Sequence, residues 1–161
     1  MIEAANLSPD MAVLEPSAGE GALVAALLRR VEVAHVTAVE VDVARASKIP
    51  GDARVRVMPG VNFLHMTPDP SYDVVIMNPP FYGTHWVEHV VHAWEFVKPR
   101  GQLIAVLPAT AEFGNSAKHL EFRDWLTKRT SQTNPFYDLP AESFASSGTR
   151  VQTCYINLYK R

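Results

Sequence analysis

The sequence contains almost no cysteine, with Cys154 alone among its 161 residues. A single thiol excludes an internal disulfide framework and a zinc site built from several cysteines, and it favours a reducing, cytoplasmic compartment. Residues 1–6 lack the basic stretch and apolar run that begin a signal peptide. No uninterrupted apolar run reaches the roughly 18 residues of a membrane span, so we expect no membrane partner.

The chain also lacks a large excess of either charge. Its 15 Lys and Arg residues stand against 17 Asp and Glu residues, for a net charge of −2. This balance excludes a surface that binds polyanions over its whole extent, although it allows a local basic face. Residues 1–80 hold 10 acidic and 6 basic side chains, and residues 81–161 hold 7 and 9. The length and the 47% hydrophobic content predict one globular domain over residues 1–161.

Short apolar or β-branched runs alternate along the chain with segments of helical character. The expected strands are 11–15, 35–40, 54–58, 73–77, 102–107, 136–139 and 151–159. The expected helices are 22–30, 42–48, 86–97 and 120–128. This alternation predicts an α/β fold with a doubly wound, mostly parallel sheet of about seven strands, the last of them antiparallel. A ligand should then bind at the carboxyl ends of the strands, near the topological switch point.

The first polar feature at a strand end is the loop from Glu15 to Gly21. Its two glycines, Gly19 and Gly21, would let the backbone approach a ligand closely. The dinucleotide fingerprint would need a third glycine where Val24 stands, and the Gly-Lys-Ser/Thr sequence of a P-loop is missing. Glu15 and Glu20 would repel a pyrophosphate and attract a cation, such as a sulfonium that carries an ammonium group. A tight turn before a helix explains the loop equally well.

Two further polar features follow later strands. Glu40 lies 19 residues after the second glycine, at the spacing of acidic residues that bind a ribose diol, although a solvated strand-end charge is the alternative. Residues 78–81, Asn-Pro-Pro-Phe, come directly after an apolar strand. The prolines fix the backbone and leave the Asn78 side chain and the Pro79 carbonyl as rigid acceptors for a planar amino group. Phe81 suits the stacking of a base taken out of its duplex, which a simple proline-rich turn does not explain.

With these motifs the sequence resembles, over nearly its whole length, the class I S-adenosylmethionine-dependent methyltransferases of the adenine-N6 DNA methylase type. Residues 15–21 resemble motif I of that family, and residues 78–81 resemble its motif IV, Asn/Asp-Pro-Pro-Tyr/Phe. Residues 88–99, 139–144 and 147–149 look most like small DNA methylases of phages and mobile elements. The resemblance implies a Rossmann-like methyltransferase fold, S-adenosylmethionine as the cofactor, and DNA as the nucleic acid partner, methylated at adenine N6.

The resemblance also implies which residues bind the cofactor. Residues 15–21 would wrap its methionine part, and Glu40 would bind the ribose hydroxyls. Asn62 would bond the adenine amino group of the cofactor, and Phe63 would pack on the adenine ring. The expected cofactor-binding residues are Glu15, Pro16, Ser17, Ala18, Gly19, Gly21, Glu40, Val41, Asn62, Phe63 and Asn78.

By the same resemblance, residues 78–81 would act on the methyl acceptor. Asn78 and Pro79 would accept hydrogen bonds from the target amino group, so that its nitrogen attacks the methyl group in line. Phe81 would stack the flipped base. The expected catalytic residues are Asn78, Pro79, Pro80 and Phe81, and the expected substrate contacts are Phe81, Tyr82 and Arg150.

Two departures from the family pattern bear on activity. Only ten residues precede Met11, where the family has a helical segment over the methionine end of the cofactor. A target-recognition domain would need about 100 further residues, so we expect low sequence specificity or a protein partner that supplies it. Three alternatives stay open: an RNA base as acceptor, a protein amide as acceptor, and a cofactor-binding module that is inactive or depends on a partner.

Histidines and late cations have less specific interpretations. His85, His89 and His92 fall at helical spacing, but no His-Glu-x-x-His pattern is present, so we expect no metal and a solvated or substrate-facing surface. The loop at 109–116 should border the target site. A solvated face is the simpler explanation for four late cations, Lys118, Arg123, Lys128 and Arg129.

Overall fold

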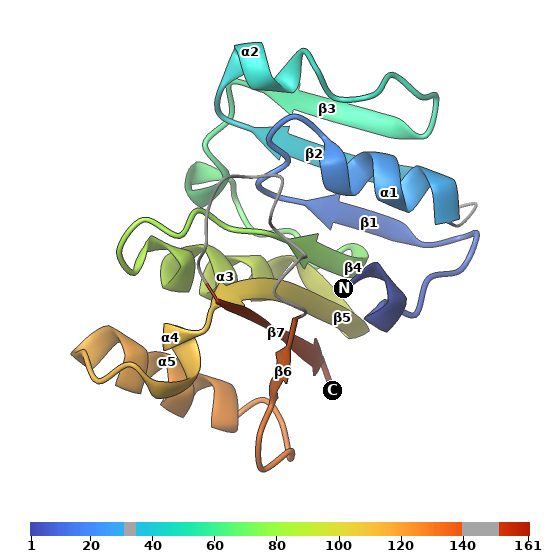
Figure 1. Ribbon diagram of the computed structural model, residues 1–161. Helices are drawn as coiled ribbons and strands as arrows, with labels where there is room; N and C mark the ends of the chain where they lie inside the picture. Colours follow the sequence, from blue (N-terminus) through green and yellow to red (C-terminus); the bar gives the residue numbers. More distant parts are fainter. Residues whose placement is uncertain (31–34, 140–151) are drawn as a thin grey trace.

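The computed structural model describes residues 1–30, 35–139 and 152–161. Figure 1 shows a sheet with helices on both sides. The strands are β1 (Ala12–Glu15), β2 (His35–Glu40), β3 (Val55–Pro59), β4 (Tyr72–Met77), β5 (Val97–Pro108), β6 (Phe136–Asp138) and β7 (Thr153–Tyr159). The helices are α1 (Ala22–Arg30), α2 (Val43–Ala46), α3 (His85–Phe96), α4 (Thr110–Phe113) and α5 (Ala117–Thr127), with 3-10 turns η1 (Ile2–Ala4) and η2 (Phe63–His65).

The sheet has the order β3-β2-β1-β4-β5-β7-β6. Strands β1 to β5 pair in parallel, whereas β7 runs antiparallel to both β5 and β6. The predicted doubly wound, mostly parallel sheet with an antiparallel last strand is therefore confirmed. The order reverses between β1 and β4, which places the topological switch point there.

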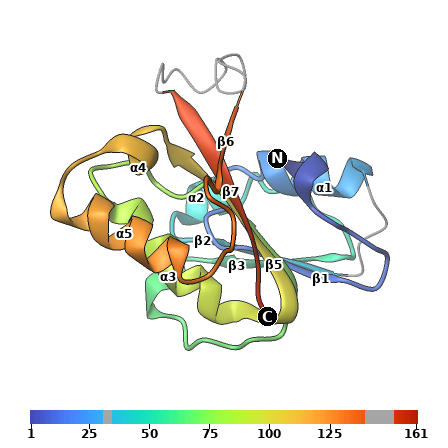
Figure 2. The ribbon, with the colours of Figure 1, turned by 90° about the horizontal axis from the view of Figure 1, so that it is seen from below.

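Two apolar layers cover the two faces of the sheet. Helix α1 and η1 lie on one face, and α3 and α5 lie on the other (Figure 2). Strand β4 shows why both layers form: Val74 and Ile76 pack with the α1 layer, while Val75 and Met77 pack with the α3 layer. A strand that is buried on both faces needs a continuous apolar run, and residues 73–77 have one. Among the described residues, no helix is long and apolar enough to cross a membrane.

The structure differs from the expected elements mainly around residues 97–101. The sequence Lys-Pro-Arg-Gly predicted a break before a strand at 102–107, yet β5 already begins at Val97. The Arg100 N–H donates to the Lys160 carbonyl at 2.9 Å, and the Lys160 N–H donates to the Gly101 carbonyl at 2.9 Å. Val97 in turn pairs with Tyr72 of β4. Pairing with these distant segments, which local sequence does not reveal, thus extends the strand.

Smaller differences concern element ends. The expected helix at 42–48 is only four residues long as α2, and α5 begins at Ala117 instead of residue 120. The turns η1 and η2 and the short helix α4 were not expected. The last strand was expected from residue 151, which lies outside the described residues, and β7 begins at Thr153.

Gln102 joins the N-terminal segment to the sheet. Its buried side-chain amide donates to the Ala4 carbonyl (2.9 Å) and to Asn157 Oδ1 (2.7 Å), and its Oε1 accepts from the Asn6 N–H (3.0 Å). These bonds connect η1 with β5 and β7. Because Ala4 and Asn157 are partly buried, losing the amide would leave polar groups there without their bonds.

We therefore predict that Gln102→Leu lowers the free energy of unfolding by about 2 kcal/mol, the cost of a few unsatisfied buried groups. Urea denaturation measures the change. Gln132→Leu is the matched control, because Gln132 is exposed and its replacement should shift stability by less than about 0.5 kcal/mol. Equal effects of the two substitutions would contradict the role given to Gln102.

Candidate functional site

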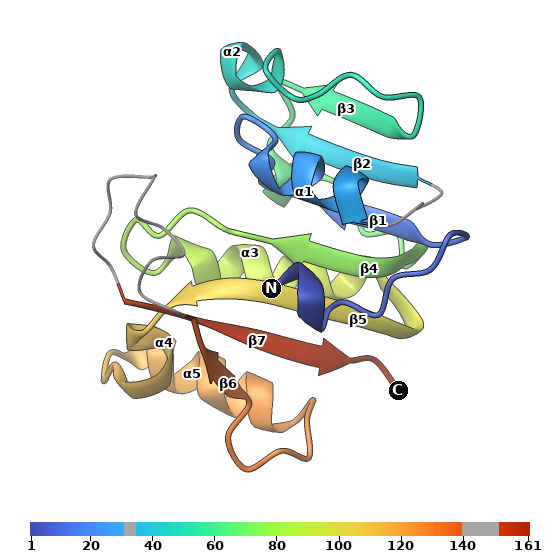
Figure 3. The ribbon, with the colours of Figure 1, turned by 45° about the vertical axis from the view of Figure 1, so that its right-hand side comes forward.

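The loops that follow β1, β2, β3 and β4 gather at one edge of the sheet, because these strands are parallel (Figure 3). They carry the three predicted polar features: residues 15–21, Glu40 and residues 78–81. The switch point between β1 and β4 lies among them. The sheet therefore brings the predicted features together at the place where doubly wound folds bind ligands.

The glycine loop connects β1 to α1. Gly19 and Gly21 have φ angles of 57° and 84°, in the left-handed region that favours glycine. A Cβ atom at Gly21 would lie 2.7 Å from Pro50 Cδ and 2.9 Å from Ile49 Cα. Gly21 is thus required by the close approach of residues 49–50, which differs from the expectation that it leaves room for a ligand.

Glu40 ties the glycine loop to the end of β2. Its carboxylate is only 6% exposed; Oε2 accepts from the Gly19 N–H at 2.7 Å, and Oε1 accepts from the Asp42 N–H at 2.9 Å. The Ala18 N–H adds a bond of 2.9 Å to the Val39 carbonyl. The side chain predicted to bind a ribose therefore also fixes the two loops beside it.

Glu15, the last residue of β1, is 2% exposed, and its Oε2 has no hydrogen-bond partner. Burial raises the pKa of this carboxyl well above its ordinary 4.5, with a smaller lowering contribution from the Val24 N–H and a raising one from the charge of Glu40. An orphaned buried carboxyl oxygen beside a ligand loop fits a ligand that brings a hydrogen-bond donor or a positive charge.

Asn62 and Phe63 stand after β3. Asn62 caps the 3-10 turn η2, where its Oδ1 accepts from the Leu64 N–H at 3.1 Å. Phe63 is buried and packs edge-on against His92 of α3, with ring centroids 4.8 Å apart, and against Phe96 at 5.1 Å. The ring is thus held by α3.

Residues 78–81 follow β4 directly, as predicted. Asn78 and Pro80 are exposed, while Pro79 is buried and holds the turn in place. Phe81 is half-buried. Tyr82 is 83% exposed and stacks on His85 at a centroid distance of 5.7 Å. The Asn78 amide is therefore presented at the sheet edge on a rigid turn.

Many of these residues line one cavity of about 180 Å³. Its lining contains eight residues from the predicted site: Pro16, Ser17, Glu40, Val41, Asn62, Phe63, Asn78 and Pro80. The other predicted residues in the described part of the chain are absent from that lining, and they are Glu15, Ala18, Gly19, Gly21, Pro79, Phe81 and Tyr82. Arg150 lies outside the described residues.

Four lining residues were not predicted as site residues: Val39, Val61, Arg45 and His89. The two valines flank predicted positions directly. Arg45 comes from α2 and His89 from α3, so only the tertiary fold places them here. Burial lowers the pKa of His89, and its Nδ1 is buried without a partner. A neutral imidazole therefore stands on the wall beside Phe63.

A second cavity, of about 670 Å³, lies on the other side of Asn78. It runs between η1, α1 and β5, and Asn78 is the residue that borders both cavities. Apolar side chains such as Ile2, Leu23 and Val106 line much of it. An amide between two cavities can contact a group held in one and a group held in the other.

The expectation that the late cations form a solvated face agrees with the exposure of Lys118 and Lys128. It is wrong for Arg129, whose guanidinium lies 4.2 Å from the centroid of the Trp125 ring and whose Nε is buried. Lys118 pairs with Glu88 at 2.5 Å, and Lys128 pairs with Asp124 at 2.6 Å. Arg123 donates to the Ala111 carbonyl at 3.2 Å. Within residues 1–30, 35–139 and 152–161, no group of three or more His, Cys, Asp or Glu residues could hold a metal ion.

Comparison with known proteins adds a family and a fold. The family model described as the methyltransferase small domain matches residues 2–120. None of the curated proteins matches the chain in sequence.

Three solved structures illustrate the likeness of fold. A protein from Listeria monocytogenes, assigned as a class I S-adenosylmethionine-dependent methyltransferase, is 18% identical with a TM-score of 0.73, over 99% of this chain and 56% of that one. A second assigned S-adenosylmethionine-dependent methyltransferase from L. monocytogenes is 12% identical with a TM-score of 0.72, over 99% and 94%. A chain from the complex of the Haloferax volcanii Trm112 methyltransferase activator with its assigned methyltransferase is 12% identical with a TM-score of 0.65, over 96% and 84%. The chain thus spans little more than half of the first of these proteins.

The buried carboxyl of Glu15 predicts a pH dependence of stability. Above about pH 4.5 the unfolded chain has lost the proton that the folded state still binds, so the free energy of unfolding falls as pH rises toward the folded pKa. Glu15→Gln removes this dependence. We therefore expect the variant to gain stability over the wild type as pH rises from about 5 to about 7, measured by urea denaturation.

Glu20→Gln is the matched control for this measurement. Glu20 is exposed, and its hydrogen bond and ion pair with Lys48 lower its pKa. Replacing Glu20 should therefore give no increase in the free energy of unfolding, relative to the wild type, as pH rises. Identical pH profiles of the wild type and Glu15→Gln would contradict a raised pKa at Glu15.

Proposed function

The chain belongs to the methyltransferase small domain family, and on that basis we propose that it methylates an exocyclic amino nitrogen, with adenine N6 in DNA as the acceptor. S-adenosylmethionine is the cofactor that the family and the fold imply. The observation that carries the proposal is the place of Asn78. It stands on a rigid Asn-Pro-Pro-Phe turn and borders both cavities.

The smaller cavity suits the cofactor. Its Val39, Val41 and Phe63 side chains offer apolar contact to a flat ring, and the Glu40 carboxylate lies between that ring site and the glycine loop. The orphaned oxygen of Glu15 supplies a buried acceptor behind the loop. The Glu40 carboxylate complements the positive charges of a ligand that carries a sulfonium and an ammonium.

When bound, S-adenosylmethionine supplies a methyl group on a positively charged sulfur. The task of the chain is to hold the acceptor nitrogen in line with that methyl group. The Asn78 side-chain oxygen and the Pro79 carbonyl accept the two amino hydrogens, which turns the nitrogen lone pair toward the methyl group. Methyl transfer would form the N–C bond as the C–S bond of the sulfonium breaks, and the nitrogen would then release a proton to water. No strong base is needed, so orientation supplies most of the acceleration.

The aromatic side chains beside this turn support a flat acceptor. Phe81 adjoins Asn78 and Pro79, and the exposed Tyr82 ring follows it. A base that has left its stack regains contact energy on such rings. A chain of similar fold occurs in a complex with a methyltransferase activator, which supports a protein partner for this chain as well. We propose that such a partner would supply target specificity.

Transfer of a labelled methyl group from S-adenosylmethionine to bulk DNA, total RNA and cell protein tests the proposal. We predict transfer to DNA, which Asn78→Ala lowers at least about 100-fold, as expected when a group that positions the transition state is removed. Asn78→Asp should retain part of the activity, because it keeps an acceptor oxygen. Gln132→Ala is the control: Gln132 is exposed and belongs to the lining of neither cavity, so its replacement should leave transfer unchanged.

The outcomes separate the alternatives. Transfer to RNA alone or to protein alone would overturn the assignment of DNA as the acceptor. It would leave the proposed reaction type, methylation of an amino nitrogen, in place. Binding of S-adenosylmethionine without transfer to any of the three pools would favour an inactive or partner-dependent module. Transfer to DNA that is unaffected by Asn78→Ala would contradict the proposed mechanism.

A further inference from the structure

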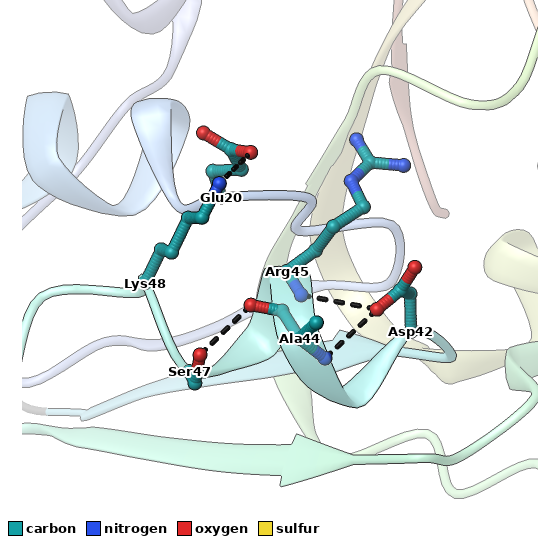
Figure 4. A network of polar contacts seen from close by, with 6 residues as sticks. All are labelled: Glu20, Asp42, Ala44, Arg45, Ser47 and Lys48. Atoms are coloured by element: carbon teal, nitrogen blue, oxygen red, sulfur yellow. Dashed lines mark hydrogen bonds and ion pairs between the residues drawn. The ribbon is translucent and has the colours of Figure 1, made fainter.

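Arg45 brings a positive charge to the smaller cavity, whose lining contains one acidic side chain, that of Glu40. It belongs to α2, the short helix after β2, and lines the smaller cavity together with Glu40 and Ser17. Its guanidinium lies against the glycine loop, because a Cβ atom at Gly19 would be 2.8 Å from Arg45 Nη2. Figure 4 shows the guanidinium extending away from the backbone of α2.

The acidic side chains around Arg45 are engaged elsewhere. Asp42 Oδ1 accepts from the backbone N–H groups of Ala44 (2.8 Å) and Arg45 (3.1 Å) (Figure 4). Glu20 forms its ion pair with Lys48 at 2.7 Å, and its interaction with the charge of Arg45 is weaker than that with Lys48. Both Glu40 oxygens accept backbone N–H groups. In the described part of the chain, no hydrogen bond or ion pair joins a side chain to the Arg45 guanidinium, so its donors are available to a ligand.

We propose that Arg45 binds the carboxylate of the methionine part of S-adenosylmethionine. This inference rests on the proposed function, because that carboxylate is the only anionic group of the cofactor. A guanidinium presents paired N–H donors in a plane, a geometry that matches a carboxylate. Arg45 therefore complements the one negative group of the ligand, while Glu40 complements its hydroxyls and positive charges.

The other anion that a guanidinium could meet here is a phosphate of the nucleic acid. The position of Arg45 favours the cofactor. It lies beside the glycine loop and Glu40, at the end of β2, whereas Phe81 and Tyr82 follow β4. The contribution of Arg45 should accordingly appear in the absence of any DNA.

Calorimetric titration of the chain with S-adenosylmethionine and with decarboxylated S-adenosylmethionine tests the assignment. The second ligand keeps the adenosine, the sulfonium and the ammonium but lacks the carboxylate. Arg45→Ala should weaken binding of S-adenosylmethionine at least about tenfold, as for one charge-assisted hydrogen-bonded contact, and binding of the decarboxylated ligand less than about twofold. Arg45→Lys, which keeps the charge without the paired donors, should give an intermediate loss.

Lys48→Ala is the matched control, because it removes an exposed cation that follows the same helix and is already paired with Glu20. It should change neither affinity by more than about twofold. An equal loss for both ligands in Arg45→Ala, or no loss for either, would overturn the carboxylate assignment. A loss of DNA affinity alone would point to a phosphate instead. If the wild-type chain bound neither ligand, the proposed function itself would be contradicted. The other outcomes would overturn only the role of Arg45 and would not contradict the proposed function.

Discussion

The candidate site depends on one buried carboxylate, that of Glu40. It accepts the Gly19 N–H at 2.7 Å and the Asp42 N–H at 2.9 Å, and it thereby joins the loop after β1 to the loop after β2. Charge-assisted bonds of this kind are strong where water is excluded. Because the glycine loop is fixed in this way, the wall of the smaller cavity has a defined shape before any ligand arrives.

The charges around that cavity form a pattern that suits a ligand with several charged groups. Glu15 and Glu40 are buried, and the Arg45 guanidinium lies close to Gly19 of the glycine loop. Two buried acids at close quarters oppose each other, and Glu15 relieves part of this repulsion through its raised pKa. A cationic ligand bound beside Glu40 would offset part of this repulsion, so ligand binding would stabilise the folded protein.

Much of the fold and part of the site follow from local sequence. The continuous apolar run at 73–77 predicts a strand buried on both faces, and β4 is one. The positions of Glu40 and residues 78–81 follow from their places at strand ends, since parallel strands bring such ends together. The strand extension at 97–101 and the cavity position of Arg45 depend on contacts with distant segments, so local sequence does not reveal them. Gly21 is a further example. Its sequence context indicates a ligand loop, but the structure shows that it packs against Ile49 and Pro50, a tertiary contact that local sequence does not reveal.

The central claim is that Asn78 presents an amino nitrogen to the methyl donor, and the identity of the methylated atom tests this most directly. DNA incubated with the chain and S-adenosylmethionine can be digested to nucleosides and analysed by chromatography and mass spectrometry. The account predicts a methyl group on the exocyclic nitrogen of adenine. A methyl group on a ring nitrogen, a carbon or an oxygen would contradict it, because the acceptors of residues 78–79 recognise an amino group.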